Sequence, residues 1–236
     1  MFCKLLKKLI FVQVLFLAGN SMATECVVLI HGFGRTSHCF KKMSANLEDN
    51  GYKTIAIDYP SRSLHVFQLA EQFILPQIQK EAANCSKVHF VGYSMGGIII
   101  RYILSNHRPK NLGRVVFVAT PNSGAEVINA FTKYTWFQTI FGPAVQDISV
   151  GSKFMESLPD KVDYETGVIS GNFSINPFTS LFILPGEDDG TVSVESTKIK
   201  GMKDQITVHS AHRAIVYNEQ VIEETFEFIR NGKFRH

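Results

Sequence analysis

Short apolar runs alternate with amphipathic segments along most of this chain. The first such run, 26–31 (CVVLIH), is continuous, contains β-branched residues and is followed by Gly32. A continuous run of this length is typical of a strand that is buried on both faces of a sheet. Comparable runs predict further strands, which we place at 53–58, 88–92, 114–119, 167–171, 181–184 and 205–209.

The segments between these runs carry apolar residues at helical spacing. They predict helices at 40–50, 63–84, 95–106 and 219–230. Gly51 is well suited to end the first helix, whereas Pro76 should kink or split the second, because proline removes a backbone donor. Strands that alternate with helices indicate βαβ units. We therefore expect an α/β fold with a mostly parallel, doubly wound sheet and helices on both faces.

Residues 1–23 follow a different pattern. Three lysines precede an apolar run at 9–19, and Ser21-Met22-Ala23 places small residues where a signal peptidase cleaves. The run is shorter than the roughly 20 residues that a membrane-spanning helix needs. We therefore expect a secretory signal peptide at 1–23 and a single domain at 24–236, exported to a bacterial periplasm or secreted, with no stable membrane span after cleavage. An uncleaved anchor is the alternative.

The signal segment also accounts for the basic balance of the chain. The whole sequence has 24 Lys+Arg and 21 Asp+Glu, and the segment 1–23 holds three lysines and no acid. The remainder therefore has 21 of each and is neutral, which gives no support to a nucleic-acid partner. The histidines show no metal-ligand spacing, so we expect neither a metal nor a cofactor.

A candidate nucleophile lies at 92–97 (GYSMGG), directly after a predicted strand and before a predicted helix. This segment matches the G-x-S-x-G pattern. The pattern places a serine on a strained strand-to-helix turn whose neighbours must be small, and the helix N-terminus then supplies backbone donors. We interpret Ser94 as the nucleophile. The alternative is a glycine-rich structural turn with an idle serine.

A glycine-rich loop, 31–36 (HGFGRT), follows the first strand. Ester hydrolysis creates a negatively charged oxygen that needs preplaced N–H donors. The loop can direct the Phe33 amide toward the same point as the Met95 amide, so we predict these two as the oxyanion hole. We interpret His31 as a structural residue of this loop. For Arg35 we favour a role in orienting loops, and contact with substrate is the alternative.

The acid and the base should follow late strands. Glu187, Asp188 and Asp189 come after the run at 181–184, and His209 and His212 come after the last predicted strand. We favour Asp189 over the other two acids, whose alternative role is a solvated turn or a calcium site. We favour His212 because it lies in a loop, whereas His209 is more typical of a packed or hydrogen-bonded core histidine.

Four segments in this order resemble the α/β-hydrolase superfamily, particularly small bacterial lipase-like and esterase-like members: HGFGRT, GYSMGG, TPNSGAE (120–126) and EDDGTVSVES (187–196). Within EDDGTVSVES, Asp189-Gly190-Thr191-Val192 matches the D-G-x-V arrangement that follows the triad acid in many lipases. The resemblance implies a triad of Ser94, Asp189 and His212. It also implies hydrolysis of a small-molecule or lipid carboxylic ester through an acyl-serine intermediate by a protein that we expect to be monomeric.

The resemblance leaves the reaction partly open. Acyl transfer, thioester cleavage or amide cleavage on the same triad is the main alternative, and a non-catalytic binding protein of this fold is a further one. The chain departs from many lipases in having Tyr93 where histidine is frequent. It also lacks a large lid domain, so interfacial activation is not implied.

The insertion 122–165 breaks the strand–helix rhythm. We interpret it as a small cap or acyl-pocket wall, because insertions after strand ends lie where α/β sheets bind ligands. The resemblance places Asn122 beside the pocket, and we predict that Trp136 and Phe137 also contact substrate. The alternative is a helical excursion whose aromatic residues are core.

Three cysteines remain after removal of the signal, Cys26, Cys39 and Cys85. In the expected fold the strands next to Cys26 and Cys85 are neighbours, so a disulfide between them is predicted for an oxidising compartment. Three buried thiols are the alternative.

Overall fold

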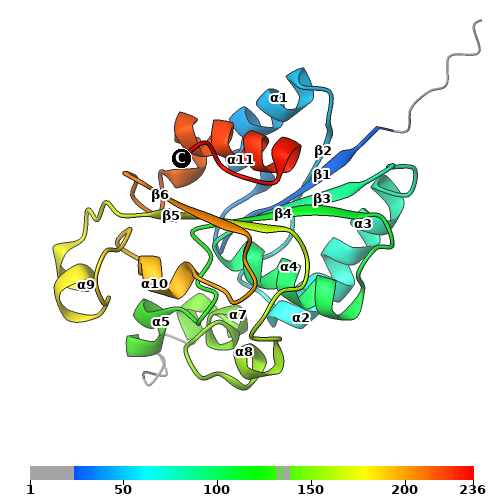
Figure 1. Ribbon diagram of the computed structural model, residues 1–236. Helices are drawn as coiled ribbons and strands as arrows, with labels where there is room; N and C mark the ends of the chain where they lie inside the picture. The colour runs from blue at the N-terminus through cyan, green and yellow to red at the C-terminus, as the bar shows by residue number, and fades with distance from the viewer. Residues whose placement is uncertain (1–23, 132–133, 135–138) are drawn as a thin grey trace, which may run out of the picture.

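The computed structural model describes residues 24–131, 134 and 139–236. In these ranges six parallel strands form one sheet in the order β2-β1-β3-β4-β5-β6 (Figure 1). Their bounds are β1 Cys26–Ile30, β2 Lys53–Ile57, β3 Val88–Tyr93, β4 Leu112–Val118, β5 Thr166–Gly171 and β6 Asp204–Val208. The prediction of a parallel, doubly wound α/β sheet is confirmed.

Helices cover both faces of the sheet. One face carries α1 (Lys41–Asp49) and α11 (Glu219–Asn231), and the other carries α2 (Val66–Leu69), α3 (Leu75–Glu81) and α4 (Met95–Asn106) (Figure 1). Every residue of β1, β3 and β5 is buried, so the central strands are sandwiched between two apolar layers. This agrees with the continuous apolar runs that predicted them.

The last helix shows how local sequence sets its bounds. The Asn218 side chain accepts hydrogen bonds from the amides of Gln220 and Val221, which would otherwise lack acceptors in the first turn. The helix ends at Gly232, whose φ of 72° is a left-handed conformation that glycine adopts without strain. Its apolar side packs Phe228 and Ile229, both fully buried, against the sheet.

The predicted helix 63–84 is split, as Pro76 indicated. A π-helical turn at Ala70–Ile74 separates α2 from α3, and Pro76 lies in the first turn of α3, where no intrahelical donor is required. The short 3-10 turns Ser37–Phe40 and Ile215–Tyr217 precede α1 and α11.

The predicted strand at 181–184 is wrong. Residues 177–182 form helix α9 (Pro177–Phe182), whose N-terminus is capped by the Asn176 side chain and has proline in its first turn. Leu181 and Phe182 are 75% and 73% exposed, so this apolar run does not enter the core. The sheet therefore passes directly from β5 to β6, with Ile169 opposite Ile206.

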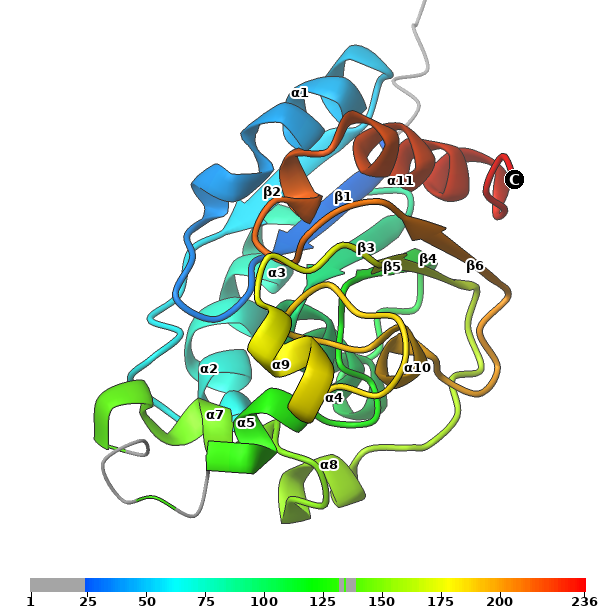
Figure 2. The ribbon, with the colours of Figure 1, turned by 90° about the vertical axis from the view of Figure 1, so that its left-hand side faces the viewer.

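Several short helices gather where the strands end, at their carboxyl edge (Figure 2). They are α5 (Glu126–Phe131), α7 (Pro143–Asp147), α8 (Lys153–Ser157), α9 and α10 (Val194–Thr197). The first three belong to the insertion 122–165, which therefore lies at the edge of the sheet where ligands of α/β folds bind.

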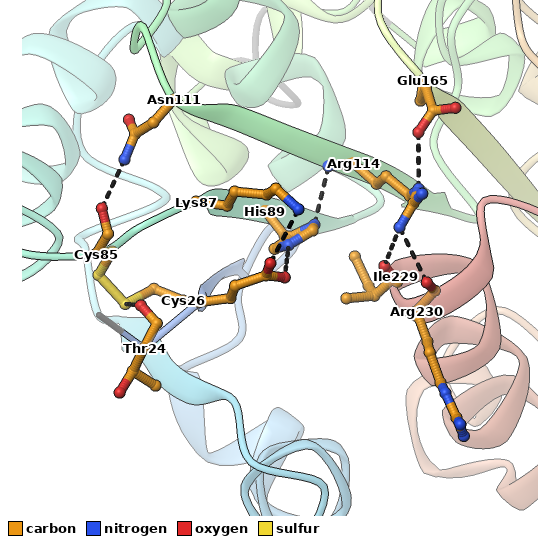
Figure 3. A network of polar contacts seen from close by, with 11 residues as sticks. Thr24, Cys26, Cys85, Lys87, His89, Asn111, Arg114, Glu165, Ile229 and Arg230 are labelled. Carbon is orange, nitrogen blue, oxygen red and sulfur yellow. Dashed lines mark hydrogen bonds and ion pairs between the residues drawn. A yellow bond between two sulfur atoms is a disulfide. The ribbon is translucent and has the colours of Figure 1, made fainter. Parts of the chain in front are cut away.

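Cys26 and Cys85 form a disulfide at the opposite edge of the sheet, with their Cα atoms 5.8 Å apart (Figure 3). Cys26 starts β1 and pairs with Val88 of β3, so the neighbouring strands bring the two thiols together. Cys39 is the remaining cysteine of the described chain and is buried as a free thiol.

A polar network lies beside this disulfide (Figure 3). The buried ring of His89 accepts a hydrogen bond at Nδ1 from the Arg114 amide (2.9 Å), and its Nε2 lies 3.0 Å from a Glu25 carboxylate oxygen. Burial lowers the pKa of His89. A neutral ring that accepts at Nδ1 must carry its proton on Nε2, so His89 donates to Glu25.

The Arg114 side chain extends this network to the last helix. Its Nε donates to Glu165 (2.7 Å), and its Nη1 donates to the carbonyls of Ile229 (2.8 Å) and Arg230 (3.1 Å). These bonds satisfy terminal carbonyls of α11 and fix the helix against β4. Within the described ranges no helix is long and apolar enough to cross a membrane. The predicted signal peptide, 1–23, lies outside those ranges.

Candidate active site

Ser94 stands on a strained turn between β3 and α4. Its backbone has φ 53° and ψ −124°, a conformation that side chains rarely adopt. The turn is tight because its neighbours are glycines. A Cβ atom at Gly92 would lie 2.5 Å from the Gly97 Cα, and one at Gly96 would lie 2.0 Å from the Ile30 carbonyl oxygen. These contacts give the physical reason for the G-x-S-x-G pattern.

The Ser94 hydroxyl, the His212 ring and the Asp189 carboxylate form a continuous chain of polar contacts. His212 Nε2 lies 3.1 Å from Ser94 Oγ, and His212 Nδ1 lies 2.7 Å from Asp189 Oδ2. The serine follows β3, the histidine follows β6, and the aspartate precedes α10. Three separate loops at the carboxyl edge of the sheet therefore bring together the three residues predicted as a triad.

Hydrogen bonds to both its carboxylate and its backbone hold Asp189 in place. Its Oδ1 accepts from the amides of Thr191 (3.0 Å) and Val192 (2.8 Å), and its backbone carbonyl accepts from the His212 amide (2.9 Å). A carboxylate only accepts hydrogen bonds, so Nδ1 of His212 carries a proton. In the neutral ring, Nε2 then presents its lone pair to the Ser94 hydroxyl.

The other candidate acids and the other candidate base lie elsewhere. Asp188 Oδ1 accepts from Ser180 Oγ (2.8 Å) and from the Gly190 amide (2.7 Å), so it stabilises its own turn. Glu187 is exposed. His209 is also exposed, with its ring 4.7 Å from that of Phe173, so the expectation of a core histidine is wrong.

The loop after β1 packs directly against the serine turn. A Cβ atom at Gly32 would lie 3.0 Å from Ser94 Cβ. The Arg35 amide donates to the Gly32 carbonyl (3.2 Å), and the Gly34 amide donates to Ser61 Oγ (2.9 Å), which together fix the turn around Phe33. Within the described part of the chain, neither the Phe33 amide nor the Met95 amide has an acceptor.

The buried His31 side chain holds this loop against the neighbouring Tyr59. Its Nδ1 lies 2.8 Å from the Gly32 carbonyl oxygen, and its fully buried ring stacks on Tyr59 at 4.1 Å. Burial lowers the pKa of His31, which favours the neutral ring. The structure therefore agrees with a structural role. Arg35 donates from Nη2 to the Arg213 carbonyl (3.2 Å), which links this loop to the histidine loop.

A pocket of about 430 Å³ opens above Ser94 and His212. One wall comes from the insertion 122–165 and is apolar, consisting of Ala125, Val127, Ile128, Phe131, Phe141, Val145 and Ile148. The insertion thus forms a pocket wall in the described residues. Trp136 and Phe137, predicted as substrate contacts, lie outside them.

Asn122 does not line this pocket. Its buried side chain donates from Nδ2 to the Thr197 carbonyl (2.7 Å), and the backbone carbonyl of Asn122 accepts from Arg101 Nη1 (2.7 Å). It borders a separate hollow behind the loop. The neighbouring Pro121 contacts the pocket instead, because the loop turns between the two residues. Within the ranges that the structure describes, no cluster of three or more His, Cys, Asp or Glu side chains could hold a metal ion.

Sequence reasoning missed two pocket residues, Arg62 and Arg213. Arg213 directly follows His212, so its position could have been inferred from the base. Arg62 comes from the segment after β2, and no local pattern marks it.

Comparisons with known proteins agree with this architecture. The sequence profile of the alpha/beta hydrolase fold family matches residues 25–147. Methylesterase 7 of Arabidopsis thaliana is 25% identical over 175 residues, which cover 64% of this chain and 66% of that protein. Norfluorocurarine synthase 1 of a Strychnos species is 33% identical over 109 residues, and the match spans only 41% of its length and 43% of this chain.

Solved structures of low sequence identity share the fold. The mature lipase BlEst2 of Bacillus licheniformis superimposes with a TM-score of 0.65 at 21% identity, covering 83% of this chain and 87% of that one. The esterase EaEST of Exiguobacterium antarcticum gives a TM-score of 0.58 at 16% identity, covering 89% of this chain and 93% of that one.

Proposed function

Since this chain belongs to the α/β-hydrolase fold family, we propose that it hydrolyses carboxylic esters through an acyl-serine intermediate. One observation carries the proposal. Ser94 Oγ, the His212 ring and the Asp189 carboxylate are connected at 3.1 Å and 2.7 Å, at the base of a pocket with an apolar wall. This is the arrangement that an activated serine nucleophile requires.

In the first step, Ser94 Oγ attacks the carbonyl carbon of the ester. His212 Nε2 takes the hydroxyl proton as the new C–O bond forms, and the carbonyl electron pair moves onto oxygen. The ring becomes an imidazolium, and the Asp189 carboxylate, 2.7 Å from Nδ1, stabilises its charge and holds its orientation.

The negative oxygen of this intermediate needs donors that are already in place. The unoccupied amides of Phe33 and Met95 supply them, and each such donor lowers the barrier by about 2.7–4 kcal/mol. Met95 is also the first residue of α4, whose N-terminus carries a partial positive charge. The stabilisation grows as the charge develops, so it lowers the barrier rather than only binding the ester.

Collapse of the intermediate breaks the bond to the alcohol. His212 returns its proton to the departing alkoxide oxygen and leaves the acyl group on Ser94. A water molecule then gives a proton to His212 and attacks the acyl carbon. In the second collapse His212 returns that proton to Ser94 Oγ, which releases the acid and regenerates the serine. The apolar wall from the insertion 122–165 is suited to hold the acyl chain during both steps.

We also propose that the protein is exported, with residues 1–23 as its signal peptide. The Cys26–Cys85 disulfide supports this, because such bonds persist in oxidising compartments.

Hydrolysis of p-nitrophenyl esters with acyl chains of increasing length tests the proposal. We expect turnover by the wild-type protein, loss of that turnover in Ser94→Ala, and labelling of wild-type Ser94 by a fluorophosphonate probe. Absence of both turnover and labelling would contradict the proposal. Labelling without turnover on any ester would instead indicate acyl transfer.

A further inference from the structure

Three arginines line the pocket above Ser94, and its described lining contains neither aspartate nor glutamate. Arg35, Arg62 and Arg213 come from three different loops and meet around this opening. A pocket that needed only to hold a neutral ester would gain nothing from three like charges placed together, because like charges repel one another.

The contacts of these arginines show where each one lies. The Arg62 guanidinium lies 5.4 Å from the centre of the Phe33 ring, and a Cβ atom at Gly34 would come within 2.9 Å of its Nη2. Arg62 therefore covers the oxyanion loop. Arg35 donates to the Arg213 backbone carbonyl, and both residues line the pocket together with His212.

Three arginines elsewhere in the chain are paired with acids, whereas the three pocket arginines are not. Arg108, Arg114 and Arg235 each form an ion pair with a carboxylate. In the part of the chain that the structure describes, the pocket arginines form no such pair, and Arg62 and Arg213 are exposed to solvent. Their charges therefore remain available to a ligand, and a bound anion would offset their mutual repulsion.

The position of the arginines also selects one end of the ester. His212 hands its proton to the departing alcohol, and Arg213 is the next residue. The acyl chain has the apolar wall, formed by residues such as Ile128 and Val145. Arg213, and Arg35 that donates to its carbonyl, therefore lie beside the base, on the alcohol side of the scissile bond.

We infer that the natural substrate is an ester with an anionic group, phosphate or carboxylate, on its alcohol part, and that Arg35, Arg62 and Arg213 bind that group. This inference rests on the proposed esterase function. Guanidinium groups suit such anions because their planar N–H donors pair with two oxygens at once. A phosphate and a carboxylate share this chemistry, and different substrates distinguish them.

Hydrolysis of matched phenyl hexanoates tests the inference. The esters are 4-hexanoyloxyphenyl phosphate, 4-hexanoyloxybenzoate and the neutral methyl 4-hexanoyloxybenzoate, with each kcat/KM divided by the ester's alkaline hydrolysis rate. We expect the wild-type protein to prefer at least one anionic ester. The preference should fall about tenfold in Arg62→Gln and in Arg213→Gln, since a hydrogen bond to a charged group contributes about 1.5 kcal/mol or more.

Arg230→Gln is the matched control. Arg230 lies on α11 over the Phe226 ring and does not line the pocket, so its loss should leave the preference unchanged. Added sodium chloride should weaken the preference of the wild-type protein, because salt screens exposed charges. Equal normalised rates for all three esters, or a preference that survives both pocket substitutions, would overturn the inference.

A binding measurement separates the inference from the proposed function. Calorimetric titration of the Ser94→Ala protein with hexyl phosphate, hexanoate and hexanol requires no turnover. At least one anion should bind about tenfold more tightly than hexanol, and this advantage should disappear when Arg62→Gln is added. Equal binding of all three ligands contradicts the anion site. Selective binding without hydrolysis of any ester contradicts the esterase proposal and leaves the anion site standing.

Discussion

The Tyr93 hydroxyl donates a 2.8 Å hydrogen bond to the backbone carbonyl of His212. Tyr93 directly precedes the proposed nucleophile, so this bond ties the loop of the base to the strand that carries the serine. Its ring is buried and packs at 5.3 Å against the imidazole. The tyrosine that distinguishes this chain from many lipases is therefore a structural connection between the two residues that we propose to react.

Removal of the Tyr93 hydroxyl should make the His212 loop less firmly held. Tyr93→Phe keeps the ring and loses one hydrogen bond, which should cost about 1 kcal/mol of unfolding free energy. We expect kcat to fall severalfold with little change in KM, because the substrate does not depend on this bond. Denaturant unfolding and steady-state kinetics measure the two effects. An equal loss of kcat in Tyr52→Phe, a tyrosine that packs against His89 away from the pocket, would contradict this explanation.

Substitution of the two adjacent aspartates, Asp188 and Asp189, should affect kcat very differently. Asp189→Asn removes the acceptor that fixes the His212 tautomer, so kcat should fall by about 10⁴-fold with little change in fold. Asp188→Asn alters only the turn bonds to Ser180 and Gly190, so the loss should be far smaller. Kinetics on one p-nitrophenyl ester, with circular dichroism of each variant, measure the contrast. Similar losses in both variants would show that Asp189 is not the orienting acid.

Gly96 should tolerate no side chain. A Cβ atom there would stand 2.0 Å from the backbone carbonyl oxygen of Ile30, and neither element can move without disturbing the sheet. We expect Gly96→Ala to give little soluble protein or a greatly reduced unfolding midpoint. Gly51→Ala is the control, because nothing lies within 4 Å of its added Cβ and only its φ of 88° is strained. It should cost about 1–2 kcal/mol.

The buried Cys39 thiol should resist modification and contribute a pH dependence. Burial raises the pKa of Cys39 to about 11 from its ordinary value of 9.0. In the unfolded chain the thiol loses its proton first, so its contribution to stability is present below pH 9 and is lost as the pH rises toward 11. The free energy of unfolding of the wild-type and Cys39→Ala proteins should be compared from about pH 8 to about pH 11. The difference between the two proteins isolates the contribution of this thiol.

Alkylation provides a second readout for the same thiol. In a Cys3→Ser background, iodoacetamide at pH 8 should modify Cys39 slowly in the native protein and quickly in denaturant, because the thiolate is the reactive form. Rapid native labelling would show that Cys39 is accessible.

Reduction of the Cys26–Cys85 disulfide should lower stability considerably. The bond closes a loop with a sequence separation of 59 residues, for which chain entropy predicts about 4 kcal/mol. We expect the unfolding midpoint of the Cys26→Ser/Cys85→Ser protein to fall accordingly, with activity retained below that midpoint because the bond lies at the edge of the sheet opposite to Ser94. An unchanged midpoint would show that the strands align without it.

Much of the fold could be predicted from sequence because its signals are local. Continuous apolar runs marked β1 and β3, and the strained turn at Ser94 requires glycines that are visible in the sequence. The run at 181–184 misled because four apolar residues carry no information about burial. In the structure, Asn176 caps a helix there, and Leu181 and Phe182 face solvent.

At the site, the residues that were mispredicted or missed also lacked a local sequence signal. Asn122 was predicted beside the pocket from its loop, but the direction of a side chain depends on backbone turns that sequence does not show. Arg62 was missed because its position over Phe33 arises from the approach of two separate loops. The position of His212 beside Ser94 could be predicted because its place after the last strand is set by chain order.

The position of the histidine loop also sets when the proposed triad can form during folding. Ser94 and its strained turn are complete once β1, β3 and α4 have packed, yet His212 arrives only after β6 has joined the edge of the sheet beside β5. A chain that has folded only as far as β5 holds Ser94 without the His212 ring beside it. Under the proposed function, the proton acceptor is therefore in place only when the last strand has docked.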